Sequence, residues 1–156
     1  MTKHHLPETE IINAAPECQI ISSRVLDTPV EKVFDAWTDP KKLARWWGPK
    51  GFTNTFNQFD LQPGGKWSFI MHGPDKGHYP NECVFLDIVK NEKLVWNHIS
   101  EPQFQIVVHF EQQPEKTKVI FWMIFESAEK CNKIKSFAAE KNQENFDRLE
   151  EVLRVG

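Results

Sequence analysis

Apolar and polar residues alternate along the middle of the chain, and this period of two constrains the fold more than any other feature. The alternation is clearest around Trp67, Trp96 and Phe110, where every second residue is apolar. The runs are separated by short breaks that contain Gly, Pro or Asn, which leaves no room for helical crossovers. The pattern predicts a meander of antiparallel strands, apolar on one face, at 52–61, 65–73, 79–90, 93–100, 103–113 and 116–126.

Two short helices are predicted between a first strand at 17–27 and this meander. Thr28-Pro29, followed by Glu31, reads as an N-cap, a proline at the first helical position and a capping acid. Asp39-Pro40 repeats the start signal, and Gly48-Pro49 ends the second helix. The apolar positions at helical spacing are Val30, Val33, Phe34 and Trp37 in the first helix and Leu43, Trp46 and Trp47 in the second.

Residues 128–153 predict one long amphipathic helix, or two in succession. The apolar face contains Ile134, Ala138, Phe146, Leu149 and Leu153. The apolar stripe weakens over 141–145, where Asn142 stands in the place of an apolar residue. Together with the strands, this order predicts an α+β fold in which a curved antiparallel sheet of six to seven strands wraps around a long C-terminal helix.

Length and charge restrict the classes of protein to which the chain can belong. Its 156 residues suit one domain, and a net charge of −3 with scattered acids and bases gives no basic surface for nucleic acid or anionic lipid. We find no secretory signal, no membrane-spanning run and no C-x-x-C pair among the three cysteines. We therefore expect a cytoplasmic protein with a flexible arm at 1–16 and one domain at 17–156, no nucleic-acid partner and no membrane insertion.

Three segments carry a resemblance to a known family. They are residues 24–40, the Arg-Trp-Trp-Gly-Pro segment at 45–49 and the Pro-Gly-Gly-Lys-Trp segment at 63–67. From about Cys18 onward the chain resembles single-domain homologues of the C-terminal domain of the heat-shock-protein-90 ATPase activator, within the START-like, birch-pollen-allergen superfamily. The resemblance implies a helix-grip fold and a hydrophobic tunnel for a lipid, an isoprenoid or a polyketide-like molecule. The eukaryotic activator grips its chaperone with an additional N-terminal domain, whereas only sixteen residues precede the first strand predicted here. Chaperone binding is therefore not the favoured expectation.

The aromatic content suggests where such a ligand would bind. Twelve Phe and six Trp stand against a single Tyr, and rings without hydroxyl groups suit a dry interior or an apolar pocket. Each ring taken alone could simply fill the core, whereas together they favour a cavity between sheet and helix. The predicted lining residues are Phe34, Trp37, Trp46, Trp47, Trp67, Phe69, Met71, Trp96, His98, Phe104, Ile106, Val108, Phe121, Met123, Phe137, Asn142 and Phe146.

The polar residues form no recognisable catalytic or metal-binding motif. The six histidines lack metal-site spacing, and no cofactor fingerprint occurs. His98 shares strand parity with Trp96, so it either points inward or ends its strand in water. Asp87 is either a buried acid or, as we favour, a residue on the wet face. Three functions follow: a non-catalytic binder of a small apolar molecule, ranked first; a polyketide-cyclase-like enzyme using His98 or Asp87; and a chaperone accessory.

One strand breaks the alternation. Residues 119–125 are apolar at both parities, so Val119, Phe121, Met123 and Phe125 can face the long helix while the outer face receives Ile120, Trp122 and Ile124. An uncovered patch of this kind is unusual for a monomer. Either the N-terminal arm folds over the patch, or two chains pair through it, and the pattern slightly favours a homodimer.

Overall fold

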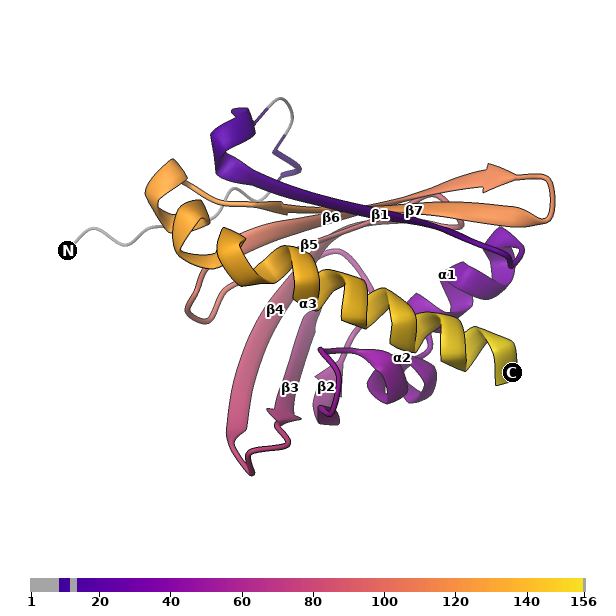
Figure 1. Cartoon of the computed structure of the whole chain (residues 1–156), viewed down its shortest axis with the longest axis horizontal. Helices are drawn as coiled ribbons and strands as arrows, with labels where there is room; N and C mark the ends of the chain where they lie inside the picture. The colour runs from indigo at the N-terminus through magenta and orange to yellow at the C-terminus, as the bar shows by residue number, and fades with distance from the viewer. Residues whose placement is uncertain (1–8, 12–13, 156) are drawn as a thin grey trace.

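The computed structural model describes residues 9–11 and 14–155, which form a seven-stranded antiparallel sheet and helices packed on one of its faces (Figure 1). The strand order is β1-β7-β6-β5-β4-β3-β2. The strands are β1 (Gln19–Leu26), β2 (Thr53–Phe59), β3 (Lys66–His72), β4 (His78–Val89), β5 (Lys93–His98), β6 (Phe104–Gln113) and β7 (Lys116–Ile124). The predicted α+β class and the predicted meander are confirmed. The first strand of the chain, β1, pairs with the last strand of the meander, β7.

The helices also follow the predicted order. A short 3-10 helix, η1 (Pro16–Cys18), precedes β1, and α1 (Val30–Thr38) and α2 (Pro40–Trp46) follow it. The N-cap predicted at Thr28 is wrong: α1 begins after Pro29 with no side-chain cap, while the Thr28 carbonyl accepts a hydrogen bond from Thr117. The second start signal is correct, since Asp39 accepts from the backbone N–H of Lys41.

Helix α3 (Ala128–Val155) is a single helix that lies across the concave face of the sheet (Figure 1). It buries Cys131, Ala138, Phe146 and Leu149 against the sheet. The inward parity of β7 is buried as predicted, and Arg24 on β1 joins sheet to helix through Asp147 and Glu150, each at 2.7 Å. None of the helices within 9–11 and 14–155 is both long and apolar enough to span a bilayer.

The outer face of the sheet carries a second, smaller apolar cluster. Val95, Val107 and Ile124 are buried there, with Leu86 and Trp122 beside them. The cover is the N-terminal segment itself, because Ile11 and Ala14 pack on this cluster. The sequence suggested two ways to cover this patch, and the first of them, the N-terminal arm, is therefore present. Pairing of two chains through Ile120, Trp122 and Ile124 stays a prediction.

The side chain of Gln105 holds the N-terminal segment on this face. It is fully buried, accepts a hydrogen bond from Ile11 N at 2.7 Å and donates to the Thr9 carbonyl at 3.0 Å. Glu10 adds an ion pair with Lys93 at 2.9 Å. Residues 1–8 and 12–13 of the predicted flexible arm lie outside the described residues, so its flexibility and the 17–156 boundary stay predictions.

Candidate ligand-binding cavity

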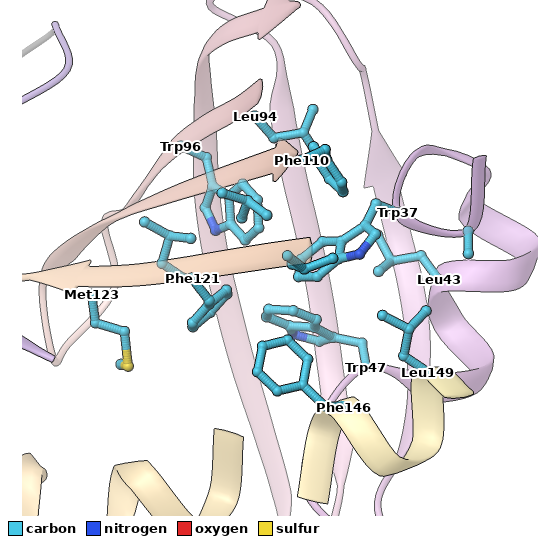
Figure 2. Close-up of a cluster of buried hydrophobic side chains, with 14 of the residues drawn as sticks. Trp37, Leu43, Trp47, Leu94, Trp96, Phe110, Phe121, Met123, Phe146 and Leu149 are labelled. Carbon is cyan, nitrogen blue, oxygen red and sulfur yellow. The ribbon is translucent and has the colours of Figure 1, made fainter. Parts of the chain in front are cut away.

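Five tryptophans meet at the centre of the core, between the sheet, α2 and α3. Figure 2 shows the indoles of Trp37 and Trp47 lying between Trp96 of the sheet and Phe146 of α3. The rings approach mainly edge to face, as with Trp47 and Trp96 at 5.9 Å between centroids. Each of these rings therefore contacts several others, as expected of a closely packed core.

A cavity of about 160 Å³ opens beside this cluster, between α3 and strands β3 to β7. Its walls come from strands β3 to β7 and from the connection after α2, and α3 forms the roof. The lining residues are Trp47, Gly48, Pro49, Phe69, Met71, Asn81, Cys83, Trp96, His98, Phe104, Ile106, Phe121, Met123, Lys141, Asn142 and Asn145. Most of the apolar members were predicted from strand parity.

Six of the predicted lining residues fill the core instead. Phe34, Trp37, Trp46, Trp67, Val108 and Phe146 are buried in the main cluster but do not line the cavity. For these, the core-filling interpretation is the correct one. Trp46 is typical, since it is fully buried and its indole N–H donates to the Ala36 carbonyl at 2.9 Å.

Phe137 was placed in the cavity wrongly. Its side chain is 51% exposed, because it lies one residue, about 100° of helical rotation, away from the inward Ala138. The missed residues Asn81 and Cys83 share the inward parity of Phe85 on β4, which the sequence could have shown. Lys141 and Asn145 flank Asn142 in the segment where the apolar stripe weakens, so this weakening marked the cavity roof.

His98 and Asn81 form the polar end of the cavity. His98 points inward, is only 7% exposed and stacks on Phe104 with ring centroids 4.7 Å apart. Its Nδ1 lies 2.8 Å from the Pro102 carbonyl and its Nε2 lies 2.7 Å from Asn81 Oδ1. Burial lowers the pKa of His98 and outweighs the opposing effect of the backbone around Pro102 and of Glu101.

The other candidate polar groups do not join this end. Asp87 lies on the outer face, half exposed, with its carboxylate 3.2 Å from Lys93 Nζ, so the favoured wet-face interpretation is correct. Cys83 does line the cavity, but burial raises the pKa of its thiol far above the ordinary value and keeps it protonated. Within 9–11 and 14–155 no group of three or more His, Cys, Asp or Glu could hold a metal ion.

Helix α3 fixes the wall formed by the α2–β2 connection. Gly48 has a φ of 101°, a left-handed backbone conformation that other residues rarely adopt, so this position favours glycine. Its N–H donates to Asn145 Oδ1 at 3.1 Å. The guanidinium of Arg148 donates to five backbone carbonyls around it, those of Arg45, Trp47, Gly48, Pro49 and Phe52.

The roof residue Asn142 gives a first testable prediction. Its amide nitrogen donates to the buried Ser22 Oγ at 3.2 Å. Replacing both partners with apolar groups, Ser22→Ala with Asn142→Leu, removes two desolvated polar groups and should raise the free energy of unfolding by about 1 kcal/mol. The larger Leu side chain should also narrow the cavity and weaken binding of apolar probes.

Chemical denaturation of the double variant and of both single variants tests this. Asn142→Leu alone leaves the Ser22 hydroxyl without its partner, so it should gain less stability than the double variant. A double variant less stable than both single variants would contradict the prediction.

Comparison with known proteins agrees with this geometry. Protein NE0264 of Nitrosomonas europaea superposes with a TM-score of 0.83 at 22% identity, over 90% of this chain and 96% of that one. A protein of Arthrobacter aurescens gives 0.83 at 22%, over 96% and 94%. Protein Ms6760 of Mycobacterium smegmatis gives 0.80 at 20%, over 94% and 98%. At these identities the likeness shows the fold alone.

No curated protein matches the chain. A family model does: the one described as "Activator of Hsp90 ATPase homolog 1-like protein" matches residues 27–154. These residues run from the end of β1 through both short helices and the meander to the last turn of α3. The chain therefore belongs to the family of Activator of Hsp90 ATPase homolog 1-like proteins.

Proposed function

We propose that this chain is a binder of a small apolar molecule, which it holds in the cavity between α3 and the sheet. The observation that carries the proposal is the lining itself, which includes the rings of Trp47, Trp96 and Phe121. Sites for small molecules are typically concave, mostly apolar and furnished with a few polar groups. His98 and Asn81 supply those polar groups here.

The size of the cavity narrows the ligand class. An engineered cavity of about 150 Å³ with an apolar lining binds benzene, and the space here is about 160 Å³. The family resemblance suggested lipids, isoprenoids or polyketide-like molecules, but pockets for such larger ligands are roughly 300–1,000 Å³. A ligand with one or two rings, or a short branched chain, fits without displacing α3.

Tryptophan fluorescence tests the proposal. Toluene and naphthalene, added to the intact protein, should quench emission saturably because Trp47 and Trp96 line the cavity. Trp47→Phe should reduce the quenched fraction, whereas Trp122→Phe on the outer face should leave it unchanged. If no apolar compound binds more tightly than millimolar, the chain is not a binder of this kind.

The two alternatives are less well supported. A cyclase-like enzyme needs convergent acid and base groups, and the described lining offers His98 with the protonated thiol of Cys83 and the half-exposed Lys141. A chaperone accessory is suggested by the description of the family, and it stays a prediction. Measured stimulation of a chaperone ATPase would support it independently of the cavity.

A further inference from the structure

The two hydrogen-bond partners of His98 can accept two protons, one more than a neutral imidazole donates. The Pro102 carbonyl can only accept, so Nδ1 must donate to it. The amide of Asn81 donates through Nδ2 to the Tyr79 carbonyl at 2.8 Å, so its oxygen faces His98 Nε2 at 2.7 Å. A neutral ring donates through one nitrogen alone, whereas an imidazolium satisfies both acceptors.

Burial opposes the charge that these hydrogen bonds favour. The ring is almost fully buried, and within the described ranges no Asp or Glu lines the cavity to compensate an imidazolium. Neither Glu82, exposed on β4, nor Glu101, exposed in the connection between β5 and β6, lines the cavity. The cavity therefore contains a potential cation with no counter-ion of its own.

Besides His98, Lys141 is the one residue of the described cavity lining that can carry a positive charge at neutral pH. Lys141 on α3 brings a second positive charge, with Glu144 3.9 Å from its Nζ. Asn142 and Asn145 line the same wall; the Asn142 amide donates to Ser22 Oγ, and Asn145 Oδ1 accepts from Gly48 N. Of the other groups around His98, Cys83 on β4 stays protonated, and the lining residues from β3, β6 and the α2–β2 connection are uncharged.

We propose that the ligand is a small carboxylic acid with an apolar body, whose carboxylate lies at the His98–Asn81 end while its body contacts Trp96 and Phe121. This inference rests on the proposed function and names the chemical class of its ligand. The carboxylate supplies the counter-ion that the imidazolium lacks, so the acid and one proton bind together.

The expected pH dependence has a definite sign. Without an anion, the pKa of His98 lies below its ordinary value and the ring is neutral at pH 7. A bound carboxylate raises this pKa, so affinity increases as the pH falls through the window between the two values, by up to about tenfold per pH unit. Below the lower value the increase ends, and the free acid itself remains ionised above about pH 5.

Benzoate and its neutral isostere benzamide test the proposal on the intact protein. We expect benzoate to bind at least tenfold more tightly than benzamide at pH 6, with the difference shrinking toward pH 8.5. The His98 ring resonances, followed by NMR, should titrate at least one unit higher with saturating benzoate than with benzamide. This measurement uses the protein without any substitution, so it tests the proposal even if a His98 variant fails to fold.

Variants supply the controls. His98→Gln should abolish the advantage of benzoate over benzamide, while His109→Gln, on the outer face beside Trp122, should preserve it. Equal, pH-independent binding of benzoate and benzamide would overturn the proposal and leave the apolar binder intact. Failure of toluene, benzamide and benzoate alike to bind would overturn the proposed function itself.

Discussion

Replacing Trp96 with Ala is expected to lower the free energy of unfolding by about 3–5 kcal/mol. The Trp96 side chain is 2% exposed and contacts the rings of Trp37, Trp47, Trp67 and Phe85. Its removal forfeits the transfer free energy of an indole and leaves space that the interlocked rings cannot fill. Thermal and chemical denaturation measure the loss.

The same variant should gain a binding activity. The space vacated by Trp96 adjoins the existing cavity, so indole should bind to the variant and restore part of the lost stability, with a gain that grows with the logarithm of the indole concentration. Phe137→Ala is the matched control, because this exposed ring should change stability by less than about 0.5 kcal/mol. A Trp96 variant as stable as the wild type would contradict the packing described here.

Replacing Arg148 with Met should cost about 2–4 kcal/mol and loosen one wall of the cavity. The guanidinium is half-buried and donates to five carbonyls of residues 45–52, at distances from 2.8 Å to 3.2 Å. Met keeps the length of the side chain but leaves these carbonyls without their donor. Arg148→Lys should not restore stability, since an ammonium has three donors and no planar fork.

Hydrogen exchange locates the effect of this variant. In Arg148→Met, the amides in the centre of β6 should exchange faster only by the factor that the loss of global stability gives, while those of Gly48 and Phe52 should exchange faster by more than that factor. Arg45→Met, which removes the same charge from an exposed side chain, is the control. Equal stability of the Arg148 and Arg45 variants would show that the carbonyl contacts contribute nothing measurable.

Local patterns predicted most of the fold because each strand and helix has its own period. Alternation gave β2 to β7 almost residue by residue, and the inward parity of β7 was correct at Val119, Phe121 and Met123. What these patterns could not show was the role of Gln105. Its side chain holds residues 9–11 across a long sequence separation, and no periodicity marks such a contact.

The site was less predictable than the fold. Parity says which face a residue occupies, but not how far along a strand the core ends and a cavity begins. Trp67 and Phe69 have the same parity, yet only Phe69 lines the cavity. The hydrogen bond between His98 and Asn81 joins β5 to β4. The sequence alone does not show how these two strands are aligned.

The pairing of β1 with β7 has a consequence for how the chain reaches this structure. β1 lies at the sheet edge, and its register runs from Gln19 opposite Ile124 to Leu26 opposite Thr117. During synthesis the first strand therefore emerges long before its partner, whereas β2 to β6 can pair with neighbours as they appear. Contacts of such large sequence separation slow folding, because the loop between them must close first. Addition of β1 to the sheet is thus a late step, because it requires β7 to have left the ribosome.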